Sequence, residues 1–175
     1  MRIAVCDDLQ QDREKLRDSL KDALAQRRIA GEVAMFNSGD SLLAQLSRGP
    51  FDAYFLDIYM EGVSGVETAY RIRERYPEAV LVFTTTSLDH MAEGFDVGAV
   101  HYLVKPVAFQ AVAEALDRCS RLMKKQEAYI TLLVDRIEKP VLDVYKRQSE
   151  NCNIYTNSKF LFFILLVIFL CCEQG

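Results

Sequence analysis

The sequence has little of what metal-binding, disulfide-linked or exported proteins need. It contains no tryptophan, two histidines (His90 and His101) and five scattered cysteines, none of which forms a C-x-x-C pair. An odd number of cysteines without a regular spacing favours reduced thiols and therefore a cytoplasmic protein. Two histidines make a histidine-built zinc site unexpected. The first residues, MRIAVCDD, lack the apolar stretch of a signal peptide.

The chain also lacks an excess of positive charge. Its net charge is -4, which gives no broad electrostatic reason to expect nucleic-acid binding. Half of its 175 residues are hydrophobic and 26% are charged, as is ordinary for a globular protein. This length allows one full domain and a fragment of another.

Short apolar runs alternate with helical patterns over the first 127 residues. The runs predict buried strands at Ile3–Cys6, Val33–Phe36, Phe51–Leu56, Val80–Phe83 and Val100–Val104. Leucines at 16, 20 and 24 form one predicted helical stripe, and Val112, Leu116, Cys119 and Leu122 form another. Five strands alternating with five helices predict an α/β fold with a doubly wound, five-stranded parallel sheet. Such folds bind ligands beyond the carboxyl ends of their strands.

Polar residues follow the predicted strands at that edge. Asp7 and Asp8 follow the first strand, Asp57 the third, a run of three threonines (84–86) the fourth and Lys105 the fifth. Carboxylates packed together repel one another unless a cation lies among them, and hard oxygen ligands suit Mg²⁺. An aspartate neutralised in this way can attack phosphorus to form an aspartyl phosphate. Lys105 and a threonine hydroxyl could then bind the phosphoryl oxygens.

These motifs carry a family resemblance. The segments RIAVCDD, YFLDIYMEGVSGVE and VFTTTSLDHMAEGFDVGAVHYLVKPV resemble those of response regulator receiver domains, and most closely of receivers with a LytTR-type DNA-binding domain. The resemblance covers residues 1–127. It implies the flavodoxin-like (βα)5 receiver fold with strand order 2-1-3-4-5.

The resemblance also implies a role for each matching residue. Asp57 would accept the phosphoryl group, which Thr85 and Lys105 would bind. Mg²⁺ would be held by Asp7, Asp8, Asp57 and the backbone carbonyl of Tyr59. Tyr102 would be the switch aromatic, and the bond before Pro106 would be cis. Glu61 stands where many receivers have proline, so a looser loop is expected there.

Simpler interpretations stay open for several of these residues. Asp7 and Asp8 could cap a helix, and Tyr102 could be an ordinary core residue. Thr84 competes with Thr85 for the phosphoryl-binding role. Phosphatases with an aspartyl nucleophile place a second aspartate where this chain has Tyr59, which argues against an enzyme. A stand-alone receiver acting through protein contacts is a further alternative.

The alternation of apolar runs and helical patterns ends at about residue 127. Residues 128–142 resemble the start of a LytTR-like domain that is truncated here, with a linker as the alternative. One reverse translation of DVYKRQ at 143–148 (GAT GTG TAT AAG AGA CAG) matches a transposon-end adapter used in sequencing libraries. We therefore interpret residues 143–175 as a non-native tail. Its apolar run Phe160–Cys172 has 13 residues, against the roughly 20 of a spanning helix, so membrane insertion is not expected.

The resemblance implies a bacterial, cytoplasmic two-component regulator. A sensor histidine kinase would phosphorylate Asp57, and phosphorylation could produce a homodimer. The output would be control of transcription, with DNA binding only where the C-terminal domain is complete.

Overall fold

The computed structural model describes residues 1–86 and 97–124. This part of the chain runs in the order β1 (Arg2–Cys6), α1 (Gln10–Gln26), β2 (Glu32–Phe36), α2 (Gly39–Gln45), η1 (Leu46–Arg48), β3 (Ala53–Asp57), α3 (Gly65–Arg75), β4 (Val80–Thr85) and β5 (His101–Val104). Residues 109–124 are also helical. The helix predicted between β4 and β5 falls on residues outside this description.

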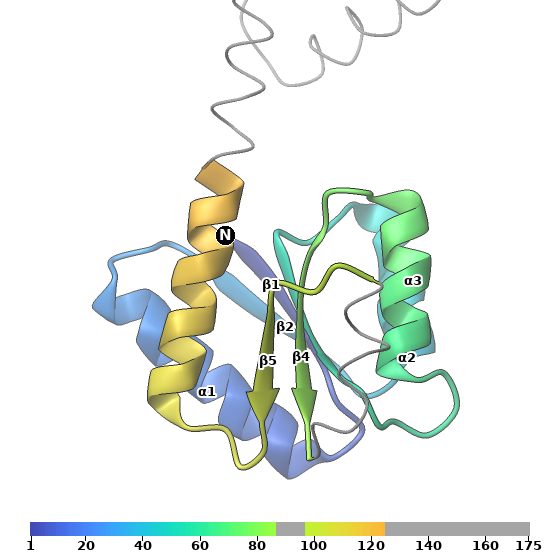
Figure 1. Cartoon of the computed structure of the whole chain (residues 1–175), viewed down its shortest axis with the longest axis horizontal. Helices are drawn as coiled ribbons and strands as arrows, with labels where there is room; N and C mark the ends of the chain where they lie inside the picture. Colours follow the sequence, from blue (N-terminus) through green and yellow to red (C-terminus); the bar gives the residue numbers. More distant parts are fainter. Residues whose placement is uncertain (87–96, 125–175) are drawn as a thin grey trace, which may run out of the picture. The chain divides into compact units, whose positions relative to one another are not determined.

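The five strands form one parallel sheet in the order β2-β1-β3-β4-β5 (Figure 1). The predicted fold class and strand order are therefore confirmed. The order reverses between β1 and β3, so the carboxyl ends of these two strands flank the topological switch point. Asp7 and Asp8 follow β1 directly, and Asp57 is the last residue of β3.

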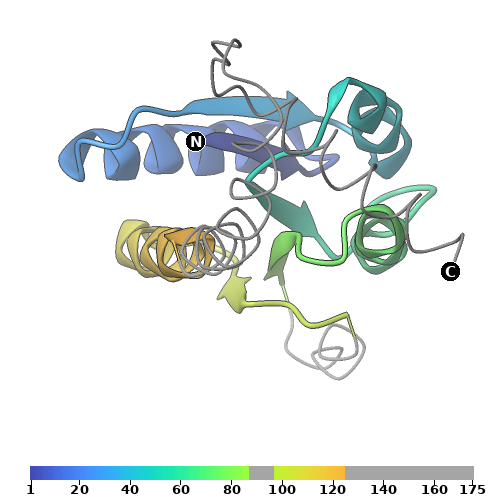
Figure 2. The same ribbon diagram turned by 90° about the horizontal axis from the view of Figure 1, so that it is seen from above.

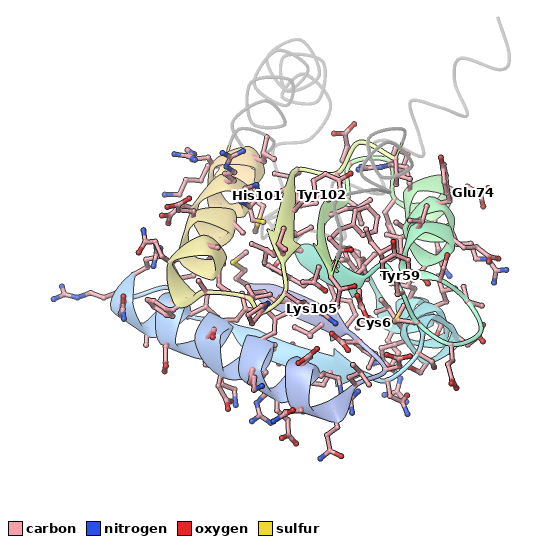
Figure 3. All side chains as sticks on the ribbon, turned by 60° about the horizontal axis from the view of Figure 1, so that its bottom comes forward. Cys6, Tyr59, Glu74, His101, Tyr102 and Lys105 are labelled. Carbon is pink, nitrogen blue, oxygen red and sulfur yellow. The ribbon has the colours of Figure 1, made fainter. Side chains whose placement is uncertain are left out.

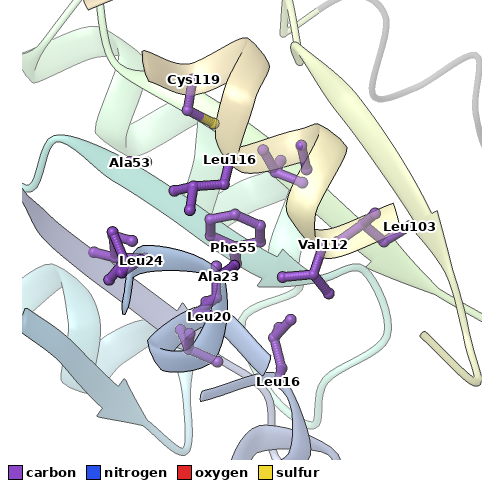
Figure 4. Close-up of a cluster of buried hydrophobic side chains, with 14 of the residues drawn as sticks. Leu16, Leu20, Ala23, Leu24, Ala53, Phe55, Leu103, Val112, Leu116 and Cys119 are labelled. Carbon is purple, nitrogen blue, oxygen red and sulfur yellow. The ribbon is translucent and has the colours of Figure 1, made fainter. Parts of the chain in front are cut away.

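Helices cover both faces of the sheet. The views in Figures 1 and 2 place α1 and the helix of residues 109–124 on one face, and α2 and α3 on the other. Leu16 and Leu20 of α1 pack with Val112, Leu116 and Phe55 in one buried cluster (Figure 4). The opposite cluster contains residues of α2 and α3, among them Leu42 and Ile72. β3 is buried at all five positions because both of its faces are covered.

Local signals set the helix starts on the α2 and α3 face. Ser38 and Ser64 each accept a hydrogen bond in their side chain from the backbone N–H three residues later. This is the N-cap geometry that the serines at these turns favour. The caps fix where the chain leaves β2 and β3 and turns back along the sheet.

Two strand ends differ from the prediction by two residues, and one predicted core position is exposed. β3 begins at Ala53, not Phe51, because the Phe51 N–H donates to the Tyr54 hydroxyl and does not pair in the sheet. β4 extends through Thr85, two residues beyond the predicted end. Leu122 is 37% exposed, so the predicted apolar stripe on its helix is buried only at Val112, Leu116 and Cys119.

The chain divides into two units, Met1–Tyr129 and Ile130–Gly175, and only the first contains described residues. The predicted LytTR-like start at 128–142 and the tail at 143–175 lie outside them. Within residues 1–86 and 97–124, no helix is long and apolar enough to cross a membrane. The apolar run Phe160–Cys172 lies outside these residues.

Candidate functional site

Lys105 lies at the centre of a group of carboxylates beyond the carboxyl ends of β1, β3 and β5. Its Nζ is 2.8 Å from Asp7 Oδ2, 3.1 Å from Asp57 Oδ2 and 3.3 Å from Asp12 Oδ2. The lysine side chain is only 9% exposed, and those of Asp7 and Asp57 less than 5%. Figure 3 shows Lys105, Cys6 and Tyr59 toward one end of the sheet. The structure thus brings the predicted lysine and two predicted aspartates into direct contact.

The predicted Mg²⁺ ligands are also close together. Asp7, Asp8 and Asp57 each offer a carboxylate oxygen, and these oxygens all lie within 4.8 Å of one another. Asp57 Oδ1 is buried, and no hydrogen-bond partner for it is found among the described residues. A buried carboxylate oxygen without a donor is unfavourable unless a cation neutralises it. These residues therefore fit a hard divalent cation with oxygen ligands.

The pKa of Asp57 shows how crowded this site is. Burial raises its pKa from 3.8 to about 6, and the charge of Asp7 adds to the rise. The charge and hydrogen bond of Lys105, together with a hydrogen bond from the Tyr59 backbone, oppose it. Burial acts to lower the pKa of Lys105, but its bonds and charge contacts with Asp7 and Asp57 raise that pKa overall. Lys105 therefore stays a cation while Asp57 ionises only at some cost.

Backbone hydrogen bonds tie the loop after β3 to β4 and to the start of α3. The Ile58 N–H donates to the Thr84 carbonyl, and the Gly65 N–H donates to the Ile58 carbonyl. A Cβ atom at Gly65 would lie 1.9 Å from the Asp57 carbonyl oxygen, so only glycine fits there. The Glu61 N–H donates to Asp8 Oδ2 at 3.0 Å. A proline would lack this N–H, so Glu61 supplies a contact to Asp8 that proline could not. The expectation of a looser loop stays a prediction.

The two candidate threonines lie on different faces of β4. Thr84 is paired in register with Asp57, and its buried hydroxyl has no partner in the described part of the chain. Alternation along the strand puts Thr85 on the face of Phe83. Phe83 is paired with Tyr102, and their ring centroids are 5.7 Å apart. Thr85 and Tyr102 therefore share a face of the sheet, and the choice between the two threonines stays a prediction.

Other contacts bear on the simpler interpretations. The N-cap of α1 is Leu9, with no side-chain cap, while Asp7 Oδ1 accepts the Leu9 N–H. Asp7 therefore does not cap α1. Tyr102 is half-buried at the edge of the core, so a core role for it stays open. The peptide bond between Lys105 and Pro106 is cis, as the resemblance implied.

Sequence reasoning missed Asp12. Its carboxylate is the third partner of Lys105, although it does not follow a strand. The sequence did contain a sign of this position. A helix that begins soon after Asp8 has Asp12 in its first turn, at the same edge of the sheet as Asp7 and Asp8.

Comparisons with known proteins agree with this geometry. The family model for the response regulator receiver domain matches residues 3–117. The positive alginate biosynthesis regulatory protein of Pseudomonas aeruginosa is 37% identical over 95 residues, which are 54% of this chain and 38% of that protein. The sensory transduction protein LytT of Oceanobacillus iheyensis is 29% identical over 108 residues, which are 61% of this chain and 40% of that protein. The chain thus spans about two fifths of the length of these relatives.

A solved structure with similar architecture is the response regulator TrrA of Thermotoga maritima in complex with Mg²⁺ and BeF. It is 28% identical with a TM-score of 0.55, and the alignment covers 67% of this chain and 97% of TrrA.

Proposed function

The chain belongs to the response regulator receiver family of two-component signalling, and we propose that its residues 1–127 form a switch that is phosphorylated on Asp57. The observation that supports this most strongly is the setting of Asp57. It is a buried carboxylate at the end of β3, with one oxygen 3.1 Å from Lys105 and the other without a partner among the described residues. Two further aspartates lie beside it.

The proposed reaction uses Asp57 as the nucleophile. One carboxylate oxygen bonds to phosphorus as the phosphorus–nitrogen bond of a kinase phosphohistidine breaks, and the electron pair of that bond returns to the imidazole. Lys105 donates to a phosphoryl oxygen and balances its charge. Asp7, Asp8, Asp57 and the Tyr59 carbonyl are the proposed holders of Mg²⁺, which when bound neutralises charge on the phosphoryl group. The donor would be a sensor histidine kinase.

Phosphorylation would act through β4 and β5. The aspartyl phosphate adds a charge of about -1.5 to -2. Thr85 is the proposed hydroxyl that moves toward this group, and Tyr102, on the same face of the neighbouring strand, would reposition in response. Val104 and Phe109 are exposed apolar residues on β5 and at the start of the next helix. Val104 on β5 is the proposed contact for a partner or a second copy of the chain.

The resemblance also supports a proposal for what the protein controls and where it acts. We propose a bacterial cytoplasmic regulator of transcription in which 128–142 begin a LytTR-like domain and 143–175 are a non-native tail. DNA binding would require the complete domain. A stand-alone receiver is the alternative, and turnover of a separate substrate is disfavoured because Tyr59 occupies the position where aspartyl phosphatases have their second aspartate.

Phosphorylation without a kinase tests the proposal. The full chain is incubated with acetyl phosphate and Mg²⁺ and its intact mass is measured, beside Asp57→Asn and, as a matched control, Asp22→Asn on the exposed side of α1. We expect a base-labile gain of one phosphoryl group in the wild type and the control only. Equal labelling of Asp57→Asn would contradict the proposal.

A further inference from the structure

We propose that Asp12 is a positioning residue that competes with the phosphoryl group for Lys105 and so slows phosphorylation of Asp57. This inference rests on the proposed function. An ammonium group has three N–H donors, and the Lys105 Nζ has three carboxylate partners: Asp7, Asp57 and Asp12. Three carboxylates therefore already surround the ammonium that a phosphoryl oxygen would need.

Asp12 is the partner that can be released. Its distance to Lys105, 3.3 Å, is the longest of the three, and its side chain is 32% exposed, whereas those of Asp7 and Asp57 are almost fully buried. Once separated from Lys105, the Asp12 carboxylate can be hydrated, so its release costs less than release of a buried partner. Asp12 is also absent from the cluster of carboxylates that fits a cation. Its contact with Lys105 is thus separable from metal binding.

The space beside this ion pair allows it to open. A pocket adjoins Asp12, Lys105, Pro106 and Thr84, at the point where α1 approaches the loop after β5. Thr84 also lines this pocket, and its buried hydroxyl has no partner among the residues described. The pocket thus offers open space beside the Lys105–Asp12 ion pair.

The charge of Asp12 acts in the same direction. A phosphodonor brings negative charge toward Asp57. Asp12 is paired with Lys105, the same lysine that must bind the incoming phosphoryl group. Removing this carboxylate takes away one ion-pair partner of Lys105 and one repulsive charge. The acceleration should therefore grow with the charge of the donor and shrink as salt screens the interaction.

The test compares phosphorylation rates of the full chain with two small donors at pH 7 in Mg²⁺. Acetyl phosphate is a dianion, and phosphoramidate is largely a monoanion. We expect Asp12→Asn to accept phosphate from acetyl phosphate about fivefold faster than wild type at low salt, as suits a partly exposed ion pair. With phosphoramidate the gain should be smaller, and 0.5 M salt should reduce both gains. Asp22→Asn makes the same change on the exposed side of α1 and should follow wild type.

Two more variants keep the test decisive. Asp12→Glu retains a carboxylate and should stay slower than Asp12→Asn. Asp12→Ser is a second neutral variant, which replaces Asp12→Asn in the comparison if Asp12→Asn does not fold. Rates for the neutral variants that equal the Asp22→Asn rate with both donors, or fall below it, would overturn the role of Asp12. Absence of label on wild-type Asp57 would instead overturn the proposed function, so the two failures are distinguishable.

Discussion

Replacement of Asp57 by asparagine should stabilise the fold at neutral pH when Mg²⁺ is removed. The wild-type carboxylate is buried and its pKa is raised from 3.8 to about 6. Each pKa unit corresponds to 1.36 kcal/mol, so ionised Asp57 costs the folded state about 3 kcal/mol relative to the unfolded chain. Asparagine has no charge to bury. It does remove one partner of Lys105, so we expect a net gain of about 1 to 3 kcal/mol in the free energy of unfolding at pH 8.

The dependence on pH has a definite sign. A carboxyl group whose folded pKa is raised contributes stability that is fully present below 3.8 and is lost as the pH rises through about 6. The difference between Asp57→Asn and wild type should therefore be largest at pH 8 and should disappear toward pH 4. Urea denaturation followed by far-UV circular dichroism in EDTA, at several pH values, measures this directly. A variant that is less stable than wild type at pH 8, or a gain that does not change with pH, would mean that ionised Asp57 does not destabilise the fold.

Mg²⁺ provides an independent check on the same variant. A ligand that binds only the folded state adds RT ln(1 + [L]/Kd), or about 2.7 kcal/mol at 100 times its Kd. We expect Mg²⁺ to stabilise wild type clearly and Asp57→Asn much less. Equal stabilisation of both proteins would place the cation elsewhere.

Three further substitutions test the surroundings of the site by urea denaturation. Lys105→Met leaves Asp7 and Asp57 buried without their cation and should lower the free energy of unfolding by about 3 kcal/mol at pH 8. The loss should shrink at pH 5. An equal loss at both pH values would contradict this. Gly65→Ala forces a Cβ against the Asp57 carbonyl oxygen and should cost about 3 kcal/mol or prevent folding; an unchanged urea midpoint would show that the loop yields. Arg73→Met removes three hydrogen bonds from the guanidinium to backbone carbonyls and should cost about 2 kcal/mol; wild-type stability would mean that water replaces them.

The sheet could be predicted from the sequence because its strands are apolar and short. Strands buried on both faces are nearly continuous apolar runs, which stand out between amphipathic helices. The ends of β3 and β4 were less predictable, because Asp57, Thr84 and Thr85 are polar residues inside the strands. Polar residues usually mark the end of a strand. Here they are paired with neighbouring strands of the sheet, and the candidate site lies where these strands end.

The site itself was only partly predictable. Asp7, Asp57 and Lys105 follow or end strands, so parallel topology alone brings them together. Asp12 and the Glu61 N–H reach the site from the first turn of a helix and from a loop. Their contacts depend on side-chain direction and loop conformation, which the spacing of residues does not determine.

Chemical mapping of the phosphorylated residue tests the central claim most directly. After reaction of the full chain with acetyl phosphate and Mg²⁺, borohydride reduction converts an aspartyl phosphate to homoserine, and peptide mass spectrometry locates the change. We expect homoserine at position 57 and at no other aspartate. Homoserine at Asp7, Asp8 or Asp12 with Asp57 unchanged would contradict it.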